Sequence, residues 1–272
     1  MRKNILLSFL FATVALLWTN SAQANIYVAG KSYSTTQSIT GPGISGKVHY
    51  NAQTKTLTLE NAHISHTGTV VDNFDNGLSI IVKGDCSITM NNPKNFFAAL
   101  STSNSMTIKG EGTLTVTSPG TAITPVFGNN ITVTIDGCTL IANGGTSGIN
   151  SSNKHKLHIR NATVKATGKN TGSIRGWAEI TLENCKLLTP IDATIGAYSG
   201  AKAVVKGGTV VKSEVEIVPK SNLIINGIDQ PNTETEATVT AIYSVDGRQL
   251  SKMQRGLNIV KMSDGTTKKV IR

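Results

Sequence analysis

Acidic and aromatic residues are scarce in this chain of 272 residues. It contains 16 Asp and Glu residues, and aromatic residues make up 5% of the sequence. Glycoside hydrolysis needs a pair of carboxyl groups for its acid and base steps, and sugar rings are commonly bound by stacking on aromatic side chains. The shortage of carboxylates argues against hydrolysis, and the shortage of aromatic rings argues against very tight sugar binding.

Sequence motifs of common enzyme classes are also missing. The chain has no Gly-x-Ser-x-Gly segment, no phosphate-binding loop and no dinucleotide fingerprint. Its histidines are scattered, and no cysteine or carboxylate lies close in sequence to the pair His63 and His66. We therefore expect the histidines to be surface residues on strands, and we expect no cofactor.

The first 24 residues have the pattern of a secretory signal. Met1-Arg2-Lys3 is positively charged, Ile5 to Trp18 is a continuous apolar run, and Ala22-Gln23-Ala24 supplies the small residues of a cleavage site. The mature chain should then begin at Asn25. No cysteine follows the apolar run, which argues against a lipoprotein anchor, and no later segment has the length of a transmembrane helix.

An internal repeat organises residues 57–227. Its unit is a pair of apolar residues separated by one position, followed two residues later by Asn or Gly, and it recurs every 20 to 27 residues. Gly and Asn best tolerate a positive φ, so the chain should turn in the same way at each repeat. The second apolar residues of the units are Leu59, Val82, Ile108, Ile135, Ile159, Leu182, Val205 and Ile225.

Two more strand-like segments follow each of these units. One contains a second apolar series, and the other follows the Asn or Gly turn directly, as in Ser87–Met90, Thr139–Ala142 and Thr209–Lys212. Three short strands per period, with no room for a helix, predict an all-β fold: a right-handed, three-sided parallel β-helix of seven to eight coils. A leucine-rich repeat is the alternative, but its upstream Leu is missing and its Asn falls one position later. The second series consists of Val71, Phe97, Ile123, Ile149, Ile174 and Ile195.

The residue that follows each repeated apolar pair gives an independent test of stacking. If the coils stack, these residues form one exposed column with a spacing of about 4.8 Å. Opposite charges would then alternate along the column, except where Lys83 meets Lys109, and such cross-strand pairs stabilise a sheet modestly. The residues of the column are Glu60, Lys83, Lys109, Asp136, Arg160, Glu183 and Lys206.

The three cysteines are expected to be free and buried. Cys86, Cys138 and Cys185 each follow an Asn or Gly turn, where other repeats carry Ala or Gly. One coil separates each from the next, and two coil steps of about 9.6 Å in total exceed the reach of a disulfide. We interpret them as small hydrophobic residues and not as metal ligands or nucleophiles.

Two groups of residues are candidate binding sites. Arg175, Trp177 and Tyr198 fall in successive coils and are a candidate platform for a sugar ring, by stacking and directed hydrogen bonds. The alternative is that the two rings fill a coil corner or pack under a loop. Asp72 and Asp75 form the one tight acidic pair of the repeat region, and its oxygens are suited to Ca²⁺, although a solvated loop is the expectation that we favour.

The mature N-terminal segment, Ile26 to Gly30 and Gly46 to Leu59, resembles a family of secreted bacterial β-helix proteins. The resemblance continues through Met106–Leu114 and Ala203–Val210 and so covers roughly residues 26–227. This family is described as carbohydrate-binding-domain-containing and pectin-lyase-like in fold. The resemblance implies the fold and a polysaccharide or glycan partner, and it transfers no catalytic residue.

The C-terminal segment resembles the sorting tails of proteins exported by the type IX secretion route. Its Ile242–Leu250 and Arg255–Lys261 segments carry the resemblance, which implies contact with secretion machinery and delivery to the cell surface or the medium. The tail should form a β-hairpin around Asp246-Gly247. The expected parts are the signal peptide 1–24, an N-terminal capping segment 25–56, the β-helix 57–227, a linker 228–240 and the tail 241–272.

Three interpretations of function follow from the sequence. The leading one is a secreted or cell-surface glycan-binding protein, monomeric and without catalysis. The others are a polysaccharide lyase or hydrolase with a dispersed active site, and a purely structural or adhesive surface protein. The net charge of +10 favours acidic polysaccharides or anionic surfaces over nucleic acid, although a generally basic surface without a chosen partner is the alternative.

Overall fold

The computed structural model describes residues 25–92, 94, 97–223, 239–263 and 265–271. The predicted signal peptide, most of the predicted linker and residues 224–227 of the last repeat unit lie outside the described residues. The chain divides into two compact units, Met1–Leu223 and Ile224–Arg272. Within the described residues, no helix is long and apolar enough to cross a membrane.

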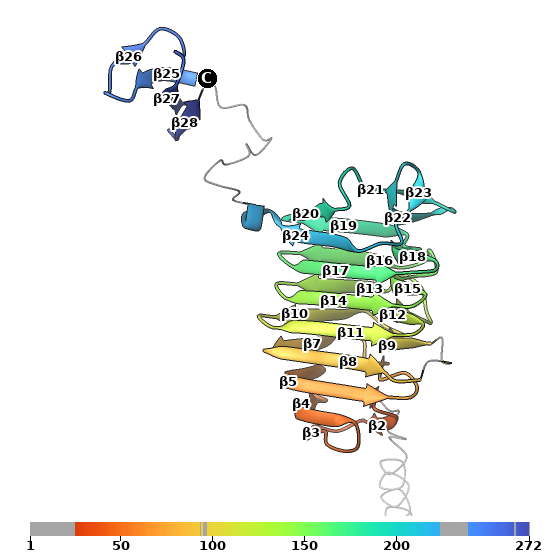
Figure 1. The fold of residues 1–272 in the computed structure, drawn as a ribbon. Coiled ribbons are helices and arrows are strands. Elements are labelled where there is room, and N and C mark those ends of the chain that lie inside the picture. The colour runs from red at the N-terminus through yellow and green to blue at the C-terminus, as the bar shows by residue number, and fades with distance from the viewer. Residues whose placement is uncertain (1–24, 93, 95–96, 224–238, 264, 272) are drawn as a thin grey trace, which may run out of the picture. The chain divides into compact units, whose positions relative to one another are not determined.

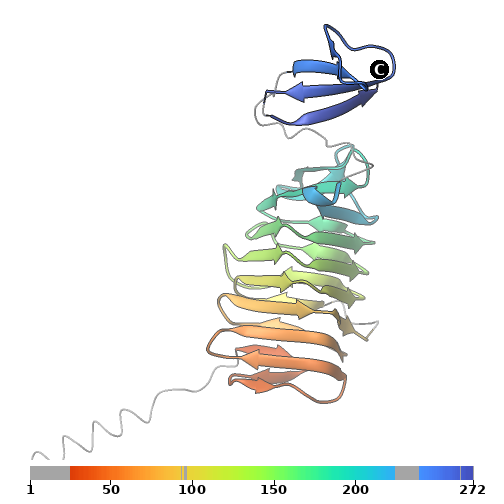
Figure 2. The same cartoon turned by 90° about the vertical axis from the view of Figure 1, so that its left-hand side faces the viewer.

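The first unit is a parallel β-solenoid of about 5 turns (Figures 1 and 2). Each regular turn contributes three short strands, which pair with the same strands of the next turn in three ladders. The first ladder contains β5 (Thr56–His66), β7 (Leu78–Lys83), β10 (Met106–Gly110), β13 (Thr132–Asp136), β16 (Lys156–Arg160) and β19 (Glu179–Glu183). The second contains β6 (Val71–Asn73), β9 (Ala98–Thr102), β12 (Thr121–Pro125), β15 (Ser147–Asn150) and β18 (Gly172–Arg175). The third contains the end of β5, then β8 (Asp85–Met90), β11 (Thr113–Ser118), β14 (Thr139–Gly144) and β17 (Thr163–Gly168).

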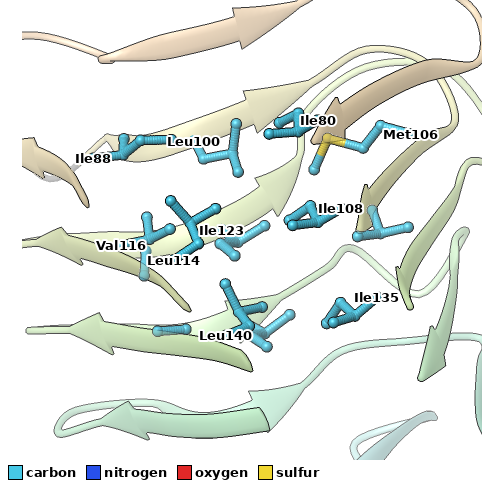
Figure 3. Packing of buried hydrophobic residues seen from close by; sticks show 14 of the residues in the cluster. Ile80, Ile88, Leu100, Met106, Ile108, Leu114, Val116, Ile123, Ile135 and Leu140 are labelled. Carbon is cyan, nitrogen blue, oxygen red and sulfur yellow. The ribbon is translucent and has the colours of Figure 1, made fainter. Parts of the chain in front are cut away.

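Alternation along the strands creates the core. In β11 the residues alternate between half-buried and buried, so that Leu114 and Val116 face inward while the threonines face outward. Figure 3 shows Ile108 from β10, Leu114 from β11 and Ile123 from β12 pointing into the same interior. All three are fully buried. Each turn therefore places one apolar layer on the layer below, and stacking buries them all.

The turns between the first and third ladders have the predicted backbone. The Asn or Gly after each apolar pair has a positive φ at every described repeat, from 45° at Asn61 to 130° at Gly110. Gly46 illustrates why no larger residue fits near these turns. A Cβ added there would lie 1.9 Å from the carbonyl oxygen of Asn61, which is a steric clash.

The register confirms most of the predicted charge column and removes its one unfavourable contact. Glu60 pairs with Lys83, and Lys109, Asp136, Arg160 and Glu183 follow one another in register. Lys83 does not meet Lys109, because β10 is shifted by two residues along β7, so that Lys109 lies opposite Ile81. Arg160 and Asp136 form a salt bridge of 2.8 Å.

The second apolar series differs from the prediction at two positions. Leu100, and not Phe97, pairs with Val71 and Ile123, and the Phe97 side chain is 72% exposed. Phe97 precedes β9, which begins at Ala98. Ile195 is also outside the ladder, because its strand pairs in antiparallel fashion at the end of the solenoid.

The solenoid has about 5 turns, and not seven or eight, because the chain changes its pairing after β19. The repeat at Ala203–Gly207 lies in an antiparallel sheet, and β24 enters between β17 and β20 in antiparallel orientation. The antiparallel pairing covers strand edges that would otherwise be open to another chain. The elements of this end are β20 (Cys185–Thr189), β21 (Thr194–Tyr198), β22 (Ala201–Lys206), β23 (Thr209–Val210), β24 (Val215–Pro219) and a 3-10 helix, η1 (Lys220–Leu223).

The N-terminal end of the solenoid is closed in a similar way. β1 (Ile26–Val28) pairs in antiparallel fashion with β2 (Lys31–Tyr33) and with β6, and β4 (Ile44–Asn51) does so with β3 (Gln37–Ser38) and β5. Tyr50 of β4 is fully buried. Antiparallel strands therefore cover the first parallel turn.

The second unit contains a four-stranded antiparallel sheet and is larger than the predicted hairpin. Its strands, in the spatial order β26-β25-β27-β28, are β25 (Val239–Ser244), β26 (Gln249–Leu250), β27 (Leu257–Met262) and β28 (Thr267–Ile271). Asn258 is buried and its side-chain amide donates to the carbonyl oxygens of Gln254 and Gly256. That side chain therefore ties the loop between β26 and β27 to the start of β27.

The cysteines are free and buried, as the sequence predicts. Their thiols lie against backbone atoms: Cys86 Sγ is 3.5 Å from the carbonyl oxygen of Lys83, and Cys185 Sγ is 3.5 Å from that of Ala162. Burial raises the pKa of Cys138 to about 11. The thiolate is the nucleophilic form, so burial makes Cys138 unreactive at neutral pH.

Candidate functional site

The structure assigns Trp177 to the core. The side chain is fully buried, and it is among the largest fully buried side chains of the described residues. Its indole Nε1 points to the carbonyl oxygen of Ile149 at 3.5 Å, and its backbone forms a β-bridge with Lys202. A ring with no exposed surface cannot stack on a sugar, so the predicted platform is wrong for Trp177.

Arg175 and Tyr198 do not form one surface with that ring. Tyr198 is half-buried and packs against a small apolar cluster of Ala203, Val205 and Val210, which is separate from the main core that contains Trp177. Arg175 is half-buried and its guanidinium Nη1 donates to the carbonyl oxygen of Thr171 at 3.4 Å. The alternative, that the rings pack inside the protein, describes Trp177, while Tyr198 packs against the small cluster of the end sheet.

The two aspartates of the candidate calcium site accept hydrogen bonds from hydroxyl groups of the protein. Asp72 accepts a hydrogen bond of 2.6 Å from Ser101 Oγ, and burial raises the pKa of the Asp72 carboxyl group. Asp75 is 7% exposed and accepts a hydrogen bond from the phenol of Tyr50. In the part of the chain that the structure describes, no group of three His, Cys, Asp or Glu side chains could hold a metal ion. These hydrogen bonds account for the two carboxylates without an ion.

One histidine departs from the expected surface position. His155 is 1% exposed, and its Nδ1 accepts a hydrogen bond of 3.3 Å from the backbone N–H of Ile131. Burial lowers the pKa of His155, with a smaller contribution from the nearby charge of Lys154. The residue is therefore a neutral part of a coil corner.

A shallow groove of about 430 Å³ crosses the outer surface of the third ladder, and we call it the third-ladder groove. It extends over four consecutive turns, from β8 to the loop after β17. Its lining combines an apolar base with hydroxyl, amide and ammonium groups. The lining residues are Met90, Thr117, Ser118, Pro119, Asn143, Gly144, Gly145, Thr167 and Lys169.

The polar residues of the groove form a column in register. Thr117 pairs with Asn143, and Asn143 pairs with Thr167. Neighbouring strands are about 4.8 Å apart, so the three side chains are spaced evenly along the stack. The groove thus presents a hydroxyl, an amide and a second hydroxyl at regular intervals.

At the base of the groove, the backbones of two neighbouring turns pack closely against each other. A Cβ added at Gly145 would lie 2.2 Å from the carbonyl oxygen of Pro119, so the corners of two turns approach each other more closely than any side chain allows. Ser118 is buried and its Oγ donates to the carbonyl oxygen of Phe97 at 3.0 Å. This hydrogen bond fixes the backbone of Phe97, whose side chain is 72% exposed, next to the groove.

Sequence reasoning identified the strands of this groove but not the groove itself. The alternating threonines of Thr113-Leu-Thr-Val-Thr117 show which side chains face outward, and this is the signal that was available. Which residues become neighbours depends on the register between turns of unequal length. The spacing from Thr117 to Asn143 differs from that between Asn143 and Thr167, so the column is hidden in the sequence.

The groove can form hydrogen bonds but lacks the groups for acid–base chemistry. Of its lining residues, Lys169 alone is ionisable, and none is a carboxylate, a histidine or a cysteine. Glycosidic bond cleavage by the common route requires two carboxyl groups that flank the bond. The arrangement is suited to holding a polar chain and not to cutting it.

Comparisons with protein-family models, with curated proteins and with solved structures found no match to this chain. The class of protein is therefore defined by the fold alone, as a parallel β-solenoid of about 5 turns.

Proposed function

We propose that this protein is a secreted or cell-surface glycan-binding protein without catalysis, and that the third-ladder groove holds the glycan. The observation that carries the proposal is the column Thr117, Asn143 and Thr167, which repeats hydrogen-bonding groups at the period of the stack above an apolar base. An extended polysaccharide repeats its hydroxyl groups in the same manner. In this proposal the three ladders are the three sides of a right-handed coil, and the molecule acts as a monomer.

The chemistry of the groove supports a saccharide over an apolar ligand. Saccharide sites combine a few directed polar groups with apolar or aromatic surface that packs on the ring faces. Pro119 supplies apolar surface above the buried Met90, and the backbone carbonyl of Phe97, a residue that is 72% exposed, is held next to the groove by Ser118. These features take the role that the sequence suggested for Trp177.

The first test removes hydroxyl groups without changing side-chain shape. In residues 25–272, Thr117→Val together with Thr167→Val should weaken binding to the best ligand of a glycan array about tenfold, because each lost hydrogen bond contributes about 0.5–1.5 kcal/mol. The measurement is isothermal titration calorimetry, with circular dichroism to check the fold.

The matched control is Thr107→Val together with Thr134→Val. These two threonines are also in-register neighbours facing outward, but they belong to the first ladder. The control should bind as the unmodified protein does. Equal weakening by both pairs, or no glycan bound on the array with and without calcium, would rule out the groove as the binding site.

The second unit is proposed to act as a sorting module that contacts secretion machinery. Its support is the separation of the chain into two compact units and the resemblance of Ile242–Leu250 to type IX sorting tails. Deletion of 233–272 in the bacterium should leave the melting temperature within about 2 °C of the original, while the protein accumulates in the periplasm. Cell fractionation and calorimetry measure the two effects. Surface delivery of the shortened chain, or a large fall in its melting temperature, would show that the unit is not an address.

A further inference from the structure

At the end of the third-ladder groove the fold brings together three segments that each carry a cationic residue. Lys169 lines the groove and is exposed. It belongs to the short loop that joins β17 to β18. Arg175, at the end of β18, reaches back to this loop, where its Nη1 donates to the carbonyl oxygen of Thr171 at 3.4 Å.

The guanidinium of Arg175 is held in place, but one of its hydrogen-bond donors has no partner among the described residues. The aliphatic part of its side chain lies over Gly172, where an added Cβ would be 3.2 Å from Arg175 Cδ. Its Nε is buried and has no hydrogen-bond partner among the described residues. A buried donor without a partner is costly, and a carboxylate bound beside the guanidinium would offset part of that cost through its charge.

The third cation comes from the segment that closes this end of the solenoid. The backbone N–H of Ser173 donates to the carbonyl oxygen of Val211 at 2.8 Å, and Ser173 Oγ donates to that of Ser213. Lys212 stands between these two residues and is exposed. It is therefore carried alongside β18, next to the loop of Lys169.

Nearby acidic groups do not neutralise the three cations. Glu216 forms its salt bridge with Lys165 at 3.2 Å, and Glu214 is exposed on the Lys212 segment. In the part of the chain that the structure describes, no salt bridge involves Lys169, Arg175 or Lys212. Three positive charges against one negative charge make this end of the groove attractive to anions.

We infer that the glycan held by the groove is acidic, and that Lys169, Arg175 and Lys212 bind the carboxylate groups of a uronic-acid polysaccharide whose neutral parts lie along Thr167, Asn143 and Thr117. This inference rests on the proposed glycan binding. A guanidinium and two ammonium groups select carboxylates by charge-assisted hydrogen bonds, which are stronger than bonds between neutral groups. The column in the groove then sets the direction of the chain.

The test compares one polymer with and without its charges. The full mature chain, residues 25–272, is titrated with alginate and with alginate whose carboxyl groups have been reduced to alcohols. Alginate should bind at least tenfold more tightly at low salt, and 0.5 M NaCl should remove most of that difference, because salt screens exposed charges.

Charge-removing variants locate the effect. Lys169→Gln, Lys212→Gln and Arg175→Gln should each weaken alginate binding about threefold to tenfold and leave the binding of the reduced polymer unchanged. Lys109→Gln is the matched control, since Lys109 is exposed on β10 of the first ladder and does not line the groove. Circular dichroism checks the fold. Lys169 and Lys212 are exposed, so their variants keep the test valid if Arg175→Gln is unstable.

Two failures are distinguishable. If both polymers bind equally and the variants change nothing, the acidic-ligand inference is overturned while glycan binding by the groove stands. If neither polymer binds and the glycan array is also blank, the proposed function fails and this inference fails with it.

Discussion

Replacement of Trp177 by Ala should lower the free energy of unfolding by about 3–5 kcal/mol, the range for a buried aromatic side chain that leaves a cavity. Trp177 is fully buried and contacts the carbonyl oxygen of Ile149 through its indole N–H. The layers of the solenoid support one another, so a cavity here weakens the turns on both sides of it. The measurement is urea unfolding of residues 25–272, followed by circular dichroism.

The same residue provides its own control by fluorescence. The sequence has 2 tryptophans, and the other, Trp18, is in the predicted signal peptide, so Trp177 is the sole indole of residues 25–272. Its emission should be blue-shifted and protected from iodide quenching in the folded protein. Trp177→Phe should lose less stability than Trp177→Ala, because the smaller ring fills part of the cavity. If Trp177→Ala is as stable as the parent protein, and iodide quenches the Trp177 fluorescence of the folded parent, the ring is exposed and the sugar-platform hypothesis stands again.

The solenoid could be predicted from the sequence because its signals are local. Alternating apolar residues and the positive-φ Asn or Gly after each pair are set within a few residues, and both recur in the structure from Asn61 onward. The inward position of the cysteines followed from the same local pattern. Local patterns of this kind survive changes in the length of the loops.

What the sequence could not provide depends on contacts between turns. The two-residue shift between β7 and β10 and the displacement of Phe97 both arise in turns of unequal length. At the end of the solenoid, Ala203–Gly207 matches the repeat but pairs in antiparallel fashion with the strands that precede and follow it. A repeat unit specifies a strand and its turn, and not the partner of that strand.

The candidate site was missed for a related reason. Trp177 is a candidate by sequence because aromatic residues are rare, but the structure buries it and pairs its backbone with Lys202, 25 residues later in the chain. The groove residues Thr117, Asn143 and Thr167 are ordinary in type and became a site through register alone. The sequence groups Arg175 with Trp177, whereas in the structure its guanidinium contacts Thr171, and on this contact it belongs to the proposed site.

Tyr50→Phe should destabilise the protein by about 1–3 kcal/mol at pH 7, because it leaves the buried carboxylate of Asp75 without its phenol donor. Tyr50 is fully buried and Asp75 is 7% exposed. The Asp75 backbone N–H and carbonyl are already paired with the side chain of Asn73, at 2.8 and 3.0 Å. This corner is therefore tightly connected, and removal of one hydroxyl is not easily compensated by movement.

The same pair predicts a loss of stability in alkaline solution. Burial and the hydrogen bond to Asp75 raise the pKa of Tyr50 from its ordinary value of 10.0 to about 12. Between these two pH values the unfolded chain has lost the phenol proton and the folded chain has kept it. The unfolded state then binds fewer protons, so the free energy of unfolding falls as the pH rises from 10 towards 12. A shift of this size corresponds to about 2–3 kcal/mol.

The measurement is the difference in unfolding free energy between the parent and Tyr50→Phe, taken by urea unfolding at several pH values. Lysines titrate in the same range, but they contribute equally to both proteins and cancel in the difference. The unfolding free energy of the parent should exceed that of Tyr50→Phe by a constant amount between pH 7 and 9, and this difference should shrink between pH 10 and 12. Tyr27→Phe, at a ring that is 40% exposed, serves as the control and should cost little at pH 7. A difference that does not change with pH would show that the phenol of Tyr50 ionises equally in the folded and unfolded states. The hydrogen bond to Asp75 would then not retain the phenol proton.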